Sequence, residues 1–214
     1  MKGELRALGA TLIDDPFEGS GFAGLRKPTH PLHNFDARGL ESIPHDLEKY
    51  LARLGKHAPL KTFAAFADAT KDDDPFGPDG VLRYLHSLAD FRAALADPSM
   101  PPDLPEFVEL KARYLGIFES VMIGHRLDAL VFPQMRCELP ALHGKETIQE
   151  TTVGEINIAG LPGIAVPAGY YASGSPFGLI FVGRLWDEAA LLGYAYAYEQ
   201  GAGRRKAKDV GGCG

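Results

Sequence analysis

The stretch from Thr152 to Gln200 constrains the fold more than any other part of this 214-residue chain. Two apolar runs, GIAVPAG at 163–169 and FGLIFVG at 177–183, are separated by the loop-forming residues ASGSP at 172–176. Each run predicts a strand, and the continuous apolar character of the first run, 163–169, is consistent with burial on both faces. Pro167 has no N–H to donate to a neighbouring strand, so we expect it at a strand end or on a sheet edge.

A helix is predicted directly after the second run. Asp187 is a suitable N-cap, and the helix is expected to reach about Gln200. Its apolar positions keep helical spacing, at Leu191, Tyr194, Ala195 and Tyr198. Gly201 is the expected residue just past the C-terminus, followed by basic residues at 204–206.

The residues NIAGLP at 157–162, just before the first run, predict a structural loop. Asn157, Gly160 and Pro162 combine a short polar side chain, a glycine and a proline, which bend a backbone and hold it in place. A role in bracing the loop by hydrogen bonding is expected for Asn157, and that role would be structural.

This part of the chain resembles the C-terminal end of the amidase signature family. The resembling residues are DALVFP at 128–133, EINIAGLP at 155–162, VPAG at 166–169, PFGLIFVG at 176–183, WDE at 186–188 and AYE at 197–199. The resemblance implies an α/β fold of sheet and helices, with strands near 129–133, 163–168 and 177–182. Upstream, GELRALGATLI at 3–13 is similar to a helix-then-strand unit of that family.

The family is known for a Ser–cis-Ser–Lys catalytic triad in a Gly/Ser-rich stretch, and this chain has no Ser-Ser pair and no Gly-Gly-Ser. No triad residue is therefore carried over. The resemblance implies a parent enzyme that cleaves the C–N bond of a carboxylic amide through an acyl-serine intermediate. We expect this chain to be catalytically incomplete without an N-terminal catalytic part. The alternative is a non-catalytic interaction or structural module, which folds alone or docks onto a partner.

The first half of the chain is expected to be rich in helices. Apolar residues at helical spacing predict helices over 1–10, 44–56, 61–70, 81–96 and 106–127, and 11–13 is a short strand candidate. Helices followed by apolar strands favour an α/β layer. We expect one incomplete domain over 1–207 and a disordered tail over 208–214.

The loop at 134–152, after the first predicted strand, is the candidate for substrate contacts. Ligands collect beyond strand ends in α/β sheets, and the resemblance implies that this loop lines the pocket. Its candidate residues are Gln134, Arg136, Cys137 and His143. A Cys137–His143 nucleophile pair lacks a third group to orient it. A surface connection without a role is the alternative for the whole loop.

Three other patterns are weaker. Gly19, Gly21 and Gly24 form G-x-G-x-x-G, but no strand directly precedes them, so a loop is favoured over a dinucleotide site. His30 and His33 lack a third zinc ligand. The three carboxylates at 72–74 lack the rest of a calcium-loop pattern. No metal and no cofactor are predicted.

Composition narrows the class of partner. The net charge of −6 argues against a nucleic-acid surface, and no apolar run is long enough to span a membrane. The N-terminus lacks the apolar core of a signal peptide, and two cysteines do not make a disulfide framework. A cytoplasmic location is the default expectation. The partners expected are a small-molecule amide for the parent enzyme and the missing catalytic part, and a homo-oligomer is compatible with the sequence.

Overall fold

The computed structural model describes residues 1–26, 38–80, 82–88, 90–141, 143, 144, 146 and 148–206. Within these ranges the chain forms two compact units, one of residues 1–26 and 110–206 and one of residues 38–109. The predicted tail at 208–214 lies outside the described residues, as do His30 and His33. The prediction of a single domain over 1–207 stays a prediction.

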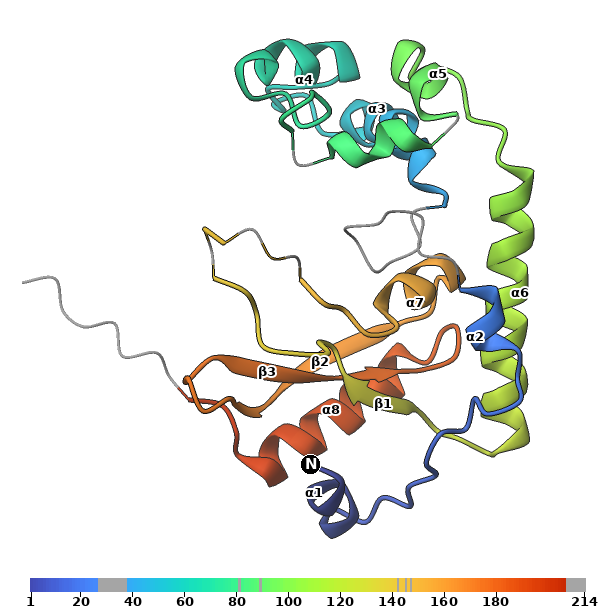
Figure 1. Ribbon diagram of the computed structural model, residues 1–214, viewed down its shortest axis with the longest axis vertical. Coiled ribbons are helices and arrows are strands. Elements are labelled where there is room, and N and C mark those ends of the chain that lie inside the picture. The colour runs from blue at the N-terminus through green and yellow to red at the C-terminus, as the bar shows by residue number, and fades with distance from the viewer. Residues whose placement is uncertain are drawn as a thin grey trace, which may run out of the picture. The chain divides into compact units, whose positions relative to one another are not determined.

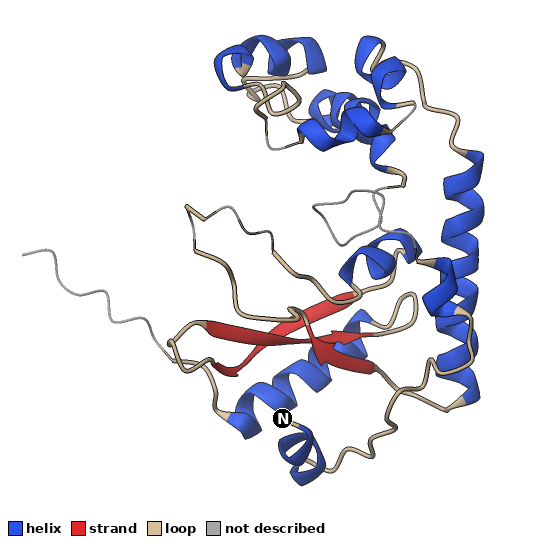
Figure 2. Ribbon diagram, in the orientation of Figure 1, coloured by secondary structure: helices blue, strands red, loops and turns tan. Residues whose placement is uncertain are grey.

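A three-stranded antiparallel sheet forms the centre of the larger unit (Figures 1 and 2). Its strands are β1 (Leu130–Pro133), β2 (Gly163–Tyr170) and β3 (Pro176–Val182), in the order β1-β3-β2. The register pairs Val131 and Ile164 with Phe181, on opposite sides of β3. All three strands lie where the sequence predicts them, and together with the helices they confirm the α/β class.

β2 is an edge strand within the described sheet, which agrees with the position of Pro167 inside it. A register shift follows between Pro167 and Gly169, typical of a β-bulge. The prediction that this strand is buried on both faces is wrong, because Gly163 and Ala165 are exposed while Val166 and Ala168 are buried. The strand is apolar throughout, but only one side of it meets the core.

One face of the sheet packs against helix α8 (Glu188–Ala202). The core there joins one face of α8 to side chains of the strands and to Leu5 near the N-terminus. Its buried residues are Leu5, Val166, Ala168, Leu179, Phe181, Leu191, Ala195 and Tyr198. Asp187 is the N-cap residue as predicted, although its side chain makes no capping hydrogen bond. Tyr194, predicted on the same face, is 38 % exposed because it lies at the margin of the contact.

The predicted end of this helix at Gly201 is wrong. The helix continues to Ala202, and Gly203, with φ of 58°, takes the left-handed conformation at its end. A β-carbon at Gly201 would lie only 2.3 Å from Cδ2 of Leu8, which follows helix α1 (Lys2–Ala7). Gly201 is therefore explained by the close approach of Leu8, and not by helix termination. Residues 11–13, expected as a strand, have no regular structure.

The other face of the sheet is buried as well, because Leu130, Ile180 and Val182 are at most 8 % exposed. Helix α7 (Val153–Ala159) lies on the side opposite α8 in Figure 1. The long helix α6 (Pro105–Gly124), predicted at 106–127, enters this unit at Leu110. Its buried rings Tyr114 and Phe118 contact Phe22 of the short helix α2 (Phe22–Leu25).

The smaller unit is helical. Its elements are η1 (Leu40–Ser42), α3 (Ile43–Arg53), α4 (Phe63–Ala69), η2 (Lys71–Asp73), η3 (Arg83–Ser87) and α5 (Phe91–Ala96). Its core consists of Phe63, Phe76, Leu85 and Phe91. The predicted helix at 81–96 is wrong as a continuous element, because Leu88 adopts an extended conformation between η3 and α5. This turn brings His86 against the ring of Phe91. No described helix is both long and apolar enough to cross a membrane.

Candidate functional site

The loop from Gln134 to Thr152 leaves the sheet at the end of β1 and returns to it before α7. Its base is closed by backbone hydrogen bonds, from Arg136 N–H to Gln149 C=O at 2.9 Å and from Thr151 N–H to Gln134 C=O at 3.2 Å. The hydroxyl of Thr151 also donates to the carbonyl of Pro133 at 2.8 Å. The two ends of the loop are therefore held together like a short hairpin.

A second contact holds the loop at its outgoing side. The hydroxyl of Ser173, in the turn between β2 and β3, donates to the carboxylate of Glu138. Hydrogen bonds from Ser173 and Ser175 lower the pKa of Glu138 below its usual value. Because the turn after β2 and the loop after β1 lie at the same end of the sheet, this end carries polar side chains from two segments.

The four residues predicted to contact substrate all belong to this loop, but no described contact joins them. Gln134 is half-buried in the loop base, while Arg136, Cys137 and His143 are exposed. Cys137 is a free thiol. Among the described residues, no hydrogen bond or ion pair links any two of these four side chains. Their role in binding a substrate stays a prediction.

The predicted structural loop at 157–162 is only partly a loop. Asn157 lies within helix α7 with its side chain exposed, so this part of the segment is helix and not loop. Its expected bracing role stays a prediction. Gly160 ends the helix in the left-handed conformation, with φ of 76°. The N–H of Leu161 donates to the carbonyl of Ile156 at 3.2 Å, as in a Schellman motif. Pro162 then accepts from Gly183 N–H at 3.1 Å, which fixes the turn to the end of β3.

Sequence reasoning missed the ion pair that holds α7. Glu155 is 1 % exposed, and its Oε1 accepts from Nε of Arg26, whose side chain is 25 % exposed. The second oxygen, Oε2, is buried without a hydrogen-bond partner among the described residues. The two residues are 129 positions apart in sequence. No local signal distinguishes Glu155, because an acidic residue beside apolar positions such as Ile156 and Ile158 is ordinary in an amphipathic helix.

A groove of about 510 Å³ lies beside β1, below the sheet face that α8 partly covers. Its lining comes from the end of α1 with the residues after it, the link from α6 to β1, one side of α8, and one residue each of β1 and β3. The lining residues are Leu5, Leu8–Ile13, His125–Ala129, Val131, Phe181, Tyr194, Ala197 and Tyr198. Most of these side chains are apolar, and the exceptions are Thr11, His125, Arg126, Asp128 and the hydroxyl groups of Tyr194 and Tyr198. Sequence reasoning assigned this groove no role.

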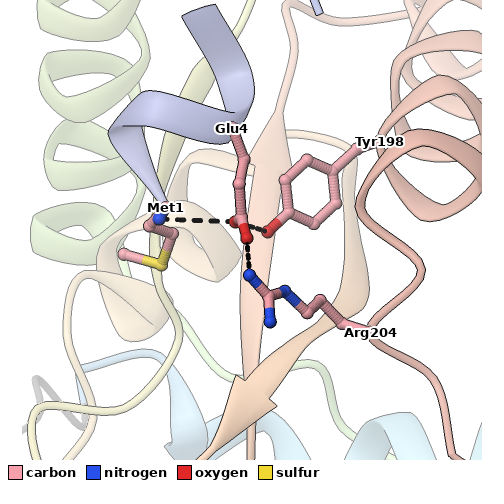
Figure 3. Close-up of polar contacts among 4 residues, drawn as sticks. All are labelled: Met1, Glu4, Tyr198 and Arg204. Carbon is pink, nitrogen blue, oxygen red and sulfur yellow. Dashed lines mark hydrogen bonds and ion pairs between the residues drawn. The ribbon is translucent and has the colours of Figure 1, made fainter. Parts of the chain in front are cut away.

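A polar cluster fixes the α1 wall of the groove to α8 (Figure 3). Glu4 accepts hydrogen bonds from the hydroxyl of Tyr198 at 3.1 Å and from the guanidinium of Arg204. The α-amino group of Met1 lies 3.3 Å from the same carboxylate. The hydrogen bond from Arg204 lowers the pKa of Glu4. Burial and the neighbouring Glu4 raise the pKa of Tyr198 to about 12.

The described residues contain no obvious catalytic or metal centre of their own. No three His, Cys, Asp or Glu side chains gather within the described ranges into a cluster that could hold a metal ion. The exposed thiol of Cys137 and the imidazole of His143 have no orienting carboxylate in contact with them there. The polar end of the sheet and the groove beside β1 are therefore surfaces for contact, each formed by segments distant in sequence.

Comparison with known proteins agrees with this description. No protein-family model matches the chain. One subunit of the glutamyl-tRNA(Gln) amidotransferase of Cereibacter sphaeroides (strain ATCC 17025 / ATH 2.4.3) is 58 % identical over 48 residues, which are 22 % of this chain and 10 % of that protein. The crystal structure of PAM12A has a TM-score of 0.55 at 26 % identity and covers 96 % of this chain. The native peptide amidase of Stenotrophomonas maltophilia has a TM-score of 0.53 at 24 % identity.

The chain spans only part of these proteins, because its match covers 39 % of both PAM12A and the peptide amidase. Within the matched part, the sequence comparison and the fold comparison both agree with the family resemblance described under Sequence analysis. By their names, these proteins include a subunit of an amidotransferase and a peptide amidase. By sequence and by fold, the chain corresponds to the C-terminal part of an amidase signature enzyme.

Proposed function

We propose that this chain is the C-terminal portion of an amide hydrolase whose reaction passes through an acyl-serine intermediate. The observation that carries the proposal is the match of nearly the whole chain to 39 % of an amidase fold, together with the lack of any paired serines in the sequence. The nucleophilic serine, the second serine and the lysine base would then come from the catalytic part. The chain itself contributes strands of the shared sheet and one wall of the pocket.

The substrate proposed for the assembled enzyme is a small molecule with a carboxamide group. The names of the relatives support a C–N bond as the reacting group, because they describe a peptide amidase and part of an amidotransferase. The loop at 134–152 would form part of the pocket wall, with Gln134 nearest the sheet and Arg136, Cys137 and His143 farther out. Backbone N–H groups of the catalytic part would hold the oxyanion.

The direct test is active-site labelling. The isolated chain is incubated with a fluorophosphonate probe, which reacts with activated serines, and is analysed by intact mass spectrometry. The peptide amidase of Stenotrophomonas maltophilia serves as the positive control. We expect no labelling of the chain under conditions that label the control completely. A labelled serine in this chain would show that it carries its own nucleophile and would disprove the proposed incompleteness.

A non-catalytic module is the second candidate, and the closed core of the larger unit favours it. Side chains are buried on both faces of the sheet, with Leu179 at 1 % and Val182 at 0 % exposure. Such a core is compatible with independent folding. Sedimentation velocity and thermal unfolding of the isolated chain separate the two candidates. A monomer that unfolds cooperatively favours the module, whereas association through open strand edges favours the incomplete hydrolase.

A further inference from the structure

We propose that Arg136 selects the substrate of the assembled amide hydrolase, and that this substrate is an amide that also carries a carboxylate. The guanidinium of Arg136 binds the carboxylate, and the carboxamide of Gln134 hydrogen-bonds the amide group of the same molecule. The inference rests on the proposed function and goes further, because it names the chemical class of the substrate and the residue that recognises it.

A short antiparallel ladder at the base of the loop fixes the backbone of Arg136. The N–H of Arg136 donates to the carbonyl of Gln149 at 2.9 Å, and Met135 pairs with Glu150 in an antiparallel bridge. Gln134 continues β1, because its N–H still donates to a carbonyl of β3 at 3.3 Å. Since successive side chains of an extended strand point to opposite faces, Gln134 and Arg136 share one face and lie about 7 Å apart along the strand.

The carboxylates closest to Arg136 in this ladder do not neutralise it. Glu150 is opposite Met135, so its side chain belongs to the other face of the ladder. Glu138, two residues beyond Arg136, accepts a hydrogen bond from the hydroxyl of Ser173. Arg136 is exposed, and among the described residues its guanidinium makes no hydrogen bond or ion pair. The guanidinium is therefore accessible to an anion from solution.

The segment that carries Arg136 is held on both sides before any ligand binds. The ladder holds it at its base, and the hydrogen bond between Ser173 and Glu138 holds it two residues later. Ser173 is itself fixed in the turn between β2 and β3, where its hydroxyl accepts from the N–H of Ser175 at 3.2 Å. A segment fixed in this way loses less conformational entropy on binding. This favours Arg136 over His143, which lies beyond the held segment.

The chemistry of these two side chains indicates the ligand. Arginine forms two parallel N–H···O bonds to a carboxylate, and such charge-assisted bonds are about twice as strong as neutral ones. The carboxamide of Gln134 offers both donors and an acceptor, as an amide group requires. The whole chain has a net charge of −6 and does not attract anions in general. Binding of a carboxylate at this place would therefore depend on Arg136 itself.

The test uses the full chain and a matched pair of ligands, succinamate and succinamide, in which a carboxamide replaces the carboxylate. Binding is followed by NMR titration of the backbone amides of Arg136 and Gln149. Arg136→Gln removes the cation, and Arg113→Gln, at an exposed position of α6, is the matched control. Acetate and inorganic phosphate are titrated in parallel to detect a general anion site. Circular dichroism confirms that both variants fold.

We expect succinamate to bind with a dissociation constant on the order of millimolar, because the chain supplies one wall of the pocket. Succinamide should bind at least about tenfold more weakly, and Arg136→Gln should weaken succinamate binding by at least about tenfold while Arg113→Gln does not. Equal binding of the two ligands, equal effects of the two variants, acetate or phosphate binding as tightly as succinamate, or the absence of saturable shifts would each overturn the assignment. Fluorophosphonate labelling of the isolated chain would instead refute the proposed function, so the two failures are distinguishable.

Discussion

The two partners of the Arg26–Glu155 ion pair differ in burial, and this difference predicts which substitution lowers the free energy of unfolding more. Glu155 is 1 % exposed and Arg26 is 25 % exposed. Arg26→Met leaves a carboxylate buried without its cation. Glu155→Gln leaves a guanidinium that retains access to water and has further interactions. We therefore expect Arg26→Met to destabilise the larger unit more than Glu155→Gln does.

The magnitudes follow from the two kinds of defect. An uncompensated buried charge costs about 3–5 kcal/mol, which is the value expected for Arg26→Met. Replacing a charged hydrogen-bond acceptor by a neutral one costs roughly 1–3 kcal/mol, which is the value expected for Glu155→Gln. In the double variant no buried carboxylate remains. Its loss of stability should therefore be smaller than the sum of the single losses by about 0.5–3 kcal/mol.

The free energy of unfolding is measured by urea titration followed by far-UV circular dichroism. Because two units are present, hydrogen exchange of the α7 amides is measured in parallel to assign the loss to the larger unit. The other contacts of Arg26 are lost both in Arg26→Met and in the double variant, so their contribution to the free energy of unfolding cancels in the double-mutant cycle. A Glu155→Gln loss equal to or greater than that of Arg26→Met, or strictly additive losses, would refute the reasoning from burial.

Three further predictions test local features. The pKa of Tyr198 is raised to about 12 in the folded chain, so the protonated tyrosine contributes its full stabilisation of the fold below pH 10 and loses it as pH rises toward 12. In Tyr198→Phe, the free energy of unfolding should therefore fall less steeply over this alkaline range. Gly160→Ala should lower the free energy of unfolding by about 1–2 kcal/mol, because φ of 76° disfavours a residue with a β-carbon. Gly193→Ala, in the interior of α8 and with open space around it, should not destabilise the fold. Equal urea midpoints for the two variants would contradict this prediction. Cys137 should react with iodoacetamide in the native chain, as located by peptide mass mapping, and protection until unfolding would show that it is not exposed.

Local pattern explains why the strands were predictable. β2 and β3 are short apolar runs bounded by glycine, proline and serine, and these residue types restrict the backbone without help from distant contacts. The long helix α6 was predictable for a similar reason, because its buried positions Leu110, Tyr114 and Phe118 recur at helical spacing. Element boundaries were less predictable where a glycine had two possible uses, as at Gly201.

Contacts between distant segments explain what was missed. Leu8 approaches α8 so closely that a β-carbon at position 201 would have to displace the Leu8 side chain, and nothing near Gly201 in the sequence indicates this. The NIAGLP segment has loop-forming residues, yet burial of Ile156 and Ile158 extends α7 through Asn157. The loop candidates Arg136 and His143 share a loop in sequence, but no hydrogen bond or ion pair joins their side chains among the described residues. The described hydrogen bonds close the base of the loop and join Glu138 to Ser173.

The sequence by itself determined the family resemblance, the α/β class, the three strands and the absence of paired serines, because each is written in residues that are neighbours along the chain. Only the tertiary structure decided the antiparallel order β1-β3-β2, the pairing of Arg26 with Glu155 and the groove beside β1. Each of these joins residues brought together by burial of apolar surface. That driving force is not directional, so local residue order does not encode its outcome.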